Sequence, residues 1–107
     1  MTPLMGIVIR TEINPETGQQ VMEDISPEGD TYTLGELYKI TRCNMIELVR
    51  LEIDGVEKLM VVDQEGMMRN KPTNNAATDV LWENNPVHRN FTVLLGDVAI
   101  IDNHEVN

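Results

Sequence analysis

The chain is poor in nucleophilic and aromatic side chains. Its 107 residues include one cysteine, one serine, one tryptophan and one phenylalanine. The lone Cys43 excludes an internal disulfide, and we expect it to be a small buried residue. Ser26 precedes Pro27 with no nucleophile elbow around it. His88 and His104 have no ligand-like spacing to Cys43. These scarcities argue against hydrolase chemistry and against a zinc set.

Glycine-rich phosphate loops and long apolar runs are also lacking. Gly66 stands alone, with no Gly-x-Gly or Gly-Lys-Thr sequence in the chain. No apolar stretch approaches the roughly 20 residues that span a membrane. The segment Met1–Ile9 lacks the charged start and apolar run of a signal peptide. We therefore expect a cytoplasmic protein that does not bind a membrane.

Basic side chains are scarce relative to acidic ones. The sequence has 8 Lys and Arg against 18 Asp and Glu, a formal net charge of −10. Nucleic acid repels such a surface, so we expect no direct nucleic-acid binding. Residues 11–36 contain seven acids and no base. Either this acidity serves solubility, or it attracts a basic partner protein. In the second case the partner-binding residues are Glu12, Glu16, Glu23, Asp24, Glu28 and Asp30.

Hydrophobic patterning predicts one α+β domain, residues 1–107, with a small, mostly antiparallel sheet and two short helices. Strands are expected at Met5–Ile9 and at Gln20–Ile25, joined by a turn with Pro and Gly. A second hairpin pairs Met45–Ile53 with Lys58–Val62 across an Asp-Gly turn. The domain divides into an acidic N-terminal hairpin (1–29), a core (30–102) and a tail (103–107).

Capping signals place the two helices. Thr33 and Glu36 fit a capping box, which predicts a helix over 34–42. Asn74 or Thr73 would cap a second helix over about 75–83. Two strands, 91–95 and 98–101, are expected to close the fold. The alternative is one long strand bent at Gly96.

Four segments carry a resemblance to a known family. They are Leu34–Arg42, Ile46–Leu51, Met60–Met68 with Lys71–Thr78, and Leu95–Ile101. In this order they resemble a small domain-of-unknown-function family that is common in phages and mobile elements. The resemblance covers roughly residues 30 to 102. It implies a phage or mobile-element origin, the host-cell cytoplasm and a compact α+β fold, but it assigns no reaction and no catalytic residue.

The segment 69–78 is the best candidate for a ligand site. A helix that starts near Asn75 offers free N–H groups and a dipole that attract anions, and two cations precede it. A small anionic ligand such as a nucleotide would contact Arg69, Lys71, Asn74, Asn75 and Thr78. An ordinary capped helix behind a polar loop is the alternative.

Two other features of this region allow more than one interpretation. Asp63 and Glu65 are a conceivable divalent-metal pair, but the ordered spacing of a calcium loop is absent. We therefore expect no metal and no cofactor. The pair Met67-Met68 suits adaptable protein binding when exposed, although we expect core positions for it.

Three hypotheses about function remain at this point. The first is a non-catalytic accessory protein that binds a host protein and inhibits a defence or metabolic factor, with DNA mimicry as a sub-case. The second is a protein that sequesters nucleotides through segment 69–78. The third is a metal-dependent enzyme using Asp63 and Glu65. We favour the first, and therefore expect no enzymatic activity. An exposed strand edge would also permit a homodimer.

Overall fold

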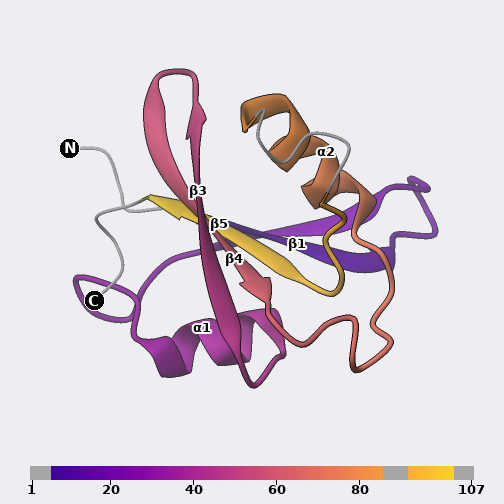
Figure 1. Cartoon of the computed structure of the whole chain (residues 1–107), viewed down its shortest axis with the longest axis horizontal. Coiled ribbons are helices and arrows are strands. Elements are labelled where there is room, and N and C mark those ends of the chain that lie inside the picture. The colour runs from indigo at the N-terminus through magenta and orange to yellow at the C-terminus, as the bar shows by residue number, and fades with distance from the viewer. Residues whose placement is uncertain (1–5, 86–91, 103–107) are drawn as a thin grey trace.

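The structure is a computed structural model that describes residues 6–85 and 92–102. This part of the chain forms one five-stranded sheet and two helices (Figure 1). The elements are β1 (Gly6–Ile13), β2 (Gln20–Ile25), α1 (Leu34–Thr41), β3 (Ile46–Ile53), β4 (Val56–Asp63), α2 (Asn75–Asn84) and β5 (Val98–Asp102). The strand order is β2-β1-β5-β4-β3, and every neighbouring pair is antiparallel. The predicted α+β class is confirmed.

The two helices lie on opposite faces of the sheet (Figure 1). Because successive side chains of a strand point to opposite faces, the parts of the central strands that are covered on both faces must be apolar at successive positions. In β4, Leu59 and Val61 pack in the cluster with Leu37 of α1, whereas Met60 and Val62 pack in the cluster with α2. The short apolar runs of β4 and β5 are therefore explained by burial on both sides.

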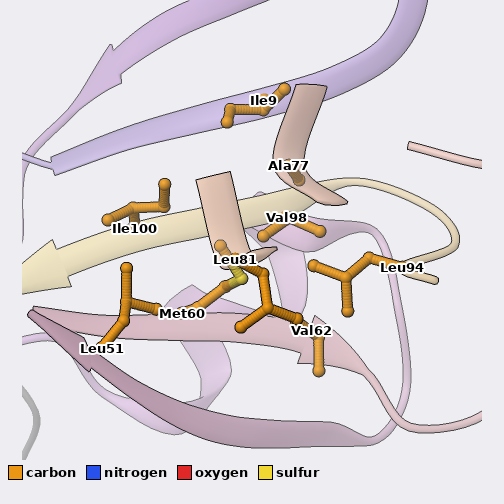
Figure 2. Packing of buried hydrophobic residues seen from close by; sticks show 9 residues of the cluster. All are labelled: Ile9, Leu51, Met60, Val62, Ala77, Leu81, Leu94, Val98 and Ile100. Carbon is orange, nitrogen blue, oxygen red and sulfur yellow. The ribbon is translucent and has the colours of Figure 1, made fainter. Parts of the chain in front are cut away.

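The larger core lies under α2 (Figure 2). Its buried members come from all the strands except β2, from α2 and from the segment before β5: Ile9, Leu51, Met60, Val62, Ala77, Leu81, Leu94, Val98 and Ile100. The sequence has few aromatic residues, so this core consists of aliphatic side chains and one methionine. The smaller cluster under α1 contains Tyr32, Leu37, Leu59, Val61, Ala99 and Ile101.

Local turn and capping signals predict the elements correctly. Asp54 and Gly55 adopt φ angles of 52° and 80°, as a two-residue type I′ hairpin turn requires. Strands β3 and β4 then pair without interruption from Ile46↔Asp63 to Ile53↔Val56. Both hydrogen bonds of the capping box between Thr33 and Glu36 are present at α1. Asn74 caps α2 by accepting from the Ala77 N–H.

The predicted strand over 91–95 is wrong for its described residues. Phe91 lies outside the described residues, and residues 92–95 form one isolated bridge, Thr73↔Leu95. The reason is that backbone groups of this segment form hydrogen bonds with the loop 72–74 instead of with a strand. The Asn74 N–H donates to the Leu94 carbonyl at 2.8 Å, and the Gly96 N–H donates to the Pro72 carbonyl at 2.8 Å. Gly96 has a φ of +80°, which ends this extended segment before β5.

The expectation that Met67 and Met68 belong to the core is also wrong. Both residues are 81% exposed. They lie in a run of turns after β4 that is closed by backbone hydrogen bonds, among them Lys71 N–H to Gly66 carbonyl at 3.0 Å. These turns direct the two methionines away from the sheet.

Candidate functional site

Almost all the basic side chains of the described residues are neutralised within the molecule. Apart from Lys39, each described Lys or Arg forms an ion pair with a carboxylate. The pairs are Arg10 with Glu23 and Asp97, Arg42 with Glu12 and Asp97, Arg50 with Glu57, Lys58 with Asp102, Arg69 with Glu65, and Lys71 with Asp63. The carboxylates outside this set are therefore the source of the net negative charge.

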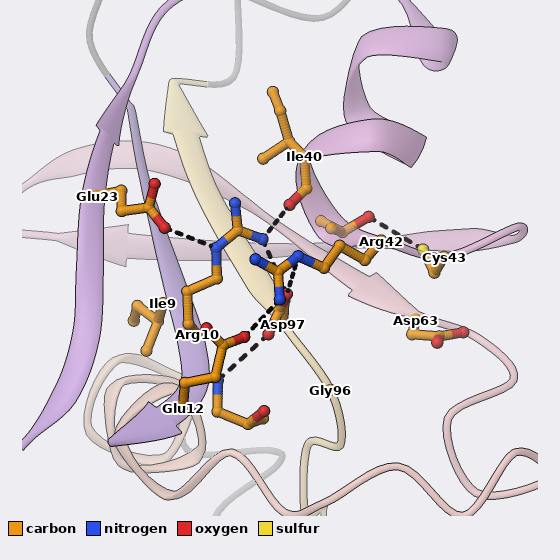
Figure 3. A network of polar contacts seen from close by, with 12 residues as sticks. Ile9, Arg10, Glu12, Glu23, Ile40, Arg42, Cys43, Asp63, Gly96 and Asp97 are labelled. Carbon is orange, nitrogen blue, oxygen red and sulfur yellow. Dashed lines mark hydrogen bonds and ion pairs between the residues drawn. The ribbon is translucent and has the colours of Figure 1, made fainter. Parts of the chain in front are cut away.

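The most buried part of this pairing centres on Arg10 of β1 (Figure 3). Its guanidinium donates from Nε to Glu23 at 2.9 Å and from NH1 to Asp97 at 2.8 Å and to the Ile40 carbonyl at 2.5 Å. Burial alone would lower the pKa of Arg10, but the hydrogen bonds to Glu23 and Asp97, with their negative charges, outweigh it and raise the pKa. This contact joins β1, β2, the start of β5 and the end of α1.

Arg42 extends the network to the surface (Figure 3). It caps α1 in the left-handed conformation, with φ 54°. Its side chain pairs with Glu12 and lies 3.6 Å from Asp97, while its carbonyl accepts a hydrogen bond from Lys71 Nζ at 3.0 Å. Lys71 Nζ also lies 2.5 Å from Asp63 Oδ2, an ion pair outside hydrogen-bond geometry. These cations hold neighbouring segments of the fold together.

Asn74, one of the predicted ligand residues, is fully buried and structural. Its Oδ1 accepts from the Ala77 N–H and from Gln20 Nε2, and its Nδ2 donates to the carbonyls of Ile9 and Gly96. An amide side chain has two donors and one acceptor oxygen with two lone pairs, so all four positions are used. Asn74 therefore has no hydrogen-bonding capacity left for a ligand.

The other predicted ligand residues are not brought together. Thr78 is 5% exposed, and its hydroxyl donates to the Asn74 carbonyl and accepts from the Leu94 N–H. Arg69 and Lys71 point to Glu65 and Asp63 respectively. Asn75 is exposed at the first position of α2. The two cations therefore pair with carboxylates of the chain and do not converge on a common ligand site.

Gln20 closes the end of α2 that was predicted to receive an anion. Its Oε1 accepts from the Ala76 N–H at 2.9 Å, and its Nε2 donates to Asn74 Oδ1 and to the Arg10 carbonyl. Because Asn74 already holds the Ala77 N–H, two N–H groups of the first turn are bound within the chain. Nothing local in the sequence signals this role of Gln20, which depends on how the hairpin folds back onto α2.

Asp63 and Glu65 are engaged in the turn after β4. Asp63 Oδ1 accepts from the Glu65 N–H at 2.8 Å, and the Glu65 carboxylate lies 3.5 Å from Arg69. Within residues 6–85 and 92–102 no three His, Cys, Asp or Glu side chains are grouped to hold a metal ion. Both carboxylates of this pair therefore have cationic side chains as neighbours.

Cys43 is buried, as expected. The residue is 8% exposed in a position after α1, and its sulfur lies 3.0 Å from the Thr41 hydroxyl. His88 and His104 lie outside the described residues. Neither described helix is long and apolar enough to cross a membrane.

The six predicted partner-binding acids fall into two groups. Glu12 and Glu23 pair with Arg42 and Arg10. The other four are exposed and form no ion pair with any described residue: Glu16, Asp24, Glu28 and Asp30. They lie in the β1–β2 turn, near the end of β2 and in the loop before α1. The β1–β2 turn and the loop before α1 lie at opposite ends of β2 (Figure 1), so these four acids are spread along the outer strand and its flanking loops. We call these four residues together the acidic hairpin surface.

A groove of about 630 Å³ lies between the β1–β2 hairpin and the start of α2. Its lining residues are Ile13, Gly18, Gln19, Gln20, Met22, Asn75, Ala76 and Asp79. Ile13 and Met22 are 55% and 53% exposed, large values for apolar side chains on a strand. The lining contains a carboxylate, Asp79, and no Lys or Arg. The groove therefore combines apolar surface with negative charge.

Comparison of the chain with protein-family models, with curated proteins and with solved structures found no match.

Proposed function

We propose that this chain is a non-catalytic accessory protein of a phage or mobile element and that it binds a host protein through the acidic hairpin surface. The partner presents a basic patch. One observation carries the proposal: ion pairing neutralises the described cations except Lys39, and of the exposed acids that it leaves without such a partner, Glu16, Asp24, Glu28 and Asp30 belong to the stretch 11–36 that contains no base.

The placement of these acids favours a binding role over solubility alone. Solubility requires net charge anywhere on the surface, whereas these four lie within a 15-residue stretch that contains no base. Asp24, Glu28 and Asp30 follow one another at the end of β2 and in the next loop. Their like charges repel one another, and a cationic partner relieves that repulsion. Complementary charge of this kind accelerates encounter and selects partners.

The consequence for the host partner is occupation of its basic surface. A basic patch on a cellular protein commonly serves to hold nucleic acid or another acidic molecule. A bound acidic domain would exclude that molecule, so the chain would act as an inhibitor without breaking any bond. Excess DNA would then compete with the chain for the same partner, which is the sub-case of DNA mimicry.

Capture from host lysate tests this function. The bait is the intact chain, and the partner is identified by mass spectrometry at about 0.1 M and about 1 M salt, where the Debye length falls from about 10 Å to about 3 Å. A variant carrying Glu16→Gln, Asp24→Asn, Glu28→Gln and Asp30→Asn removes the acidic hairpin surface. The matched control removes the same charge elsewhere, with Glu47→Gln, Glu52→Gln, Asp54→Asn and Glu83→Gln.

The proposal predicts a protein that is captured at the lower salt concentration, lost at the higher one, and lost with the hairpin variant but kept with the control. Equal capture by both variants would show that net charge alone is responsible. A parallel incubation with duplex DNA distinguishes mimicry, because only a partner with a nucleic-acid surface is then released.

A further inference from the structure

The outer strand β2 has an open side next to the groove. In the sheet β2 pairs with β1 only, so within the described residues its other edge has no strand beside it. Gln20, Met22 and Asp24 point to the face that carries α2, as their pairing with β1 shows: Met22 lies opposite Ile9, which belongs to the core under α2. The groove is thus continuous with an unpaired strand edge.

We propose that this groove receives an extended segment of the partner protein, which adds to β2 as a further strand and places a Lys or Arg two residues away from an apolar side chain. The inference rests on the proposed function, because it names the part of the basic partner that the acidic domain contacts. An open edge offers unpaired backbone groups for such an addition.

The apolar half of this requirement comes from Met22 and Ile13. Each residue is more than half exposed, and both line the groove. A methionine adapts its shape to different aliphatic partners. An apolar side chain of the added strand would cover Met22 and thereby remove both apolar surfaces from water.

The requirement for a Lys or Arg in the added strand comes from two carboxylates near Met22. Asp24 follows on the same face of β2, and Asp79 lies on the α2 wall of the groove. Side chains two residues apart in an extended strand lie on one face, about 7 Å apart. A long Lys or Arg side chain next to the covering apolar residue therefore reaches a carboxylate, whereas an acidic side chain there would be repelled.

The groove is also held in a fixed shape. Gln20 forms part of its lining and links the hairpin to α2 through hydrogen bonds to the Ala76 N–H, to Asn74 and to the Arg10 carbonyl. A partner therefore meets a preformed surface, and little ordering of this chain opposes binding.

Synthetic peptides test the proposal without a known partner. The probe is a fluorescently labelled ten-residue peptide, Lys-Thr-Ile-Thr-Lys-Thr-Ile-Thr-Lys-Thr, titrated with the intact chain and followed by anisotropy. One control peptide has Glu in place of every Lys. A second has every other backbone amide N-methylated, which removes strand hydrogen bonds but keeps charge and side chains. We expect binding by the first peptide and by neither control.

Variants locate the binding site. Met22→Thr combined with Asp79→Asn should weaken peptide binding about tenfold or more, which corresponds to about 1.4 kcal/mol. The matched control, Val56→Thr with Glu83→Gln, changes an equally exposed valine and another acid of α2 and should leave binding unchanged. Urea unfolding of both variants confirms that they are folded.

The outcomes separate this inference from the proposed function. Absence of binding, equal binding of the N-methylated peptide, or equal binding by the two double variants overturns the groove. If capture of the lysate partner depends on the acidic hairpin surface but not on Met22 and Asp79, the proposed function is supported and strand addition at the groove is refuted. If peptides bind as expected while no lysate protein is captured, strand addition at the groove is supported and the proposed function is refuted.

Discussion

Arg10 and Asp97 form an ion pair between residues 87 positions apart in the sequence, with N–O separation of 2.8 Å and side chains only 11% and 6% exposed. Asp97 also accepts from the Thr11 N–H at 3.2 Å, so one carboxylate links the residue before β5 to β1 through side chain and backbone. The pair connects the N-terminal hairpin to the strand at the centre of the sheet.

Removing the charge of Asp97 should be strongly destabilising. Asp97→Asn leaves the Arg10 guanidinium buried with less compensating charge, and breaking one partner of a buried pair typically costs about 3 kcal/mol or more. The control is Glu57→Gln, which affects an exposed pair with Arg50 at 3.8 Å and should change stability by less than about 1 kcal/mol. Urea unfolding measures both. Similar losses for the two variants would show that the Arg10 contact contributes no more than a surface pair.

Mutation to alanine should affect stability very differently at the neighbouring residues Asn74 and Asn75. Asn74→Ala removes four hydrogen bonds at a fully buried position and leaves the Ile9 and Gly96 carbonyls without this donor. Each buried polar group left unsatisfied costs about 1–3 kcal/mol, so we expect a loss of about 3 kcal/mol or more. Asn75→Ala, at an exposed position, should stay within about 0.5 kcal/mol. Thermal or urea unfolding decides between this structural role for Asn74 and a role in ligand binding.

Two methionines provide a matched test of the core. Met60 is fully buried under α2 and Met67 is 81% exposed. Met60→Ala should lower the free energy of unfolding by about 3 kcal/mol because it removes buried contacts and leaves a cavity. Met67→Ala should change it by less than about 0.5 kcal/mol. A large loss at Met67 would contradict its exposed position in the turn after β4.

Glu36 should make the stability of the domain depend on pH. Its carboxylate accepts hydrogen bonds from the backbone N–H groups of Glu28 and Thr33, which lower the pKa of Glu36 below the ordinary value of 4.5. A lowered pKa means that the charged form stabilises the fold. This contribution is present above pH 4.5 and is lost as the pH falls through the folded-state pKa.

The corresponding measurement compares wild type with Glu36→Gln. The free energy of unfolding should be higher for the wild type at about pH 7, and the difference should be smaller at an acidic pH below the folded-state pKa of Glu36, where the wild-type carboxylate is protonated. Glu52→Gln, on the exposed face of β3, serves as control and should show no such change with pH. A difference between wild type and Glu36→Gln that is equal at the two pH values would refute the role of the charge.

The features that sequence predicts well are those decided by neighbouring residues. The capping box of Thr33 and Glu36 and the turn at Asp54 and Gly55 need only a few adjacent positions, and both occur as expected. Alternation of apolar and polar residues likewise predicts the β3–β4 hairpin. Because these interactions are short-range, they can be predicted from a few adjacent residues.

The features that sequence misses depend on contacts between distant segments. Residues 92–95 have an apolar pattern suited to a strand, but loop 72–74 takes their backbone hydrogen bonds. Asp97 lies directly before the apolar strand β5 and is buried, so its carboxylate needs a partner. Nothing local identifies Arg10 as that partner.

The candidate site divides in the same way. The acidic stretch is visible in the composition, and four of its six predicted residues are exposed without an ion pair in the described structure. The predicted anion site at segment 69–78 lacks a common pocket because Gln20, Asp63 and Glu65 engage its groups from elsewhere in the chain. Sequence proximity of cations therefore overestimates positive potential when acids are in excess.

The most direct test of the central claim is the salt dependence of the dissociation constant of the captured host protein. The measurement compares wild type with the variant that carries Glu16→Gln, Asp24→Asn, Glu28→Gln and Asp30→Asn. The account predicts that wild-type affinity falls steeply with increasing salt and that the variant binds weakly with a shallower slope. Equal affinity and equal slope for the two proteins would contradict it.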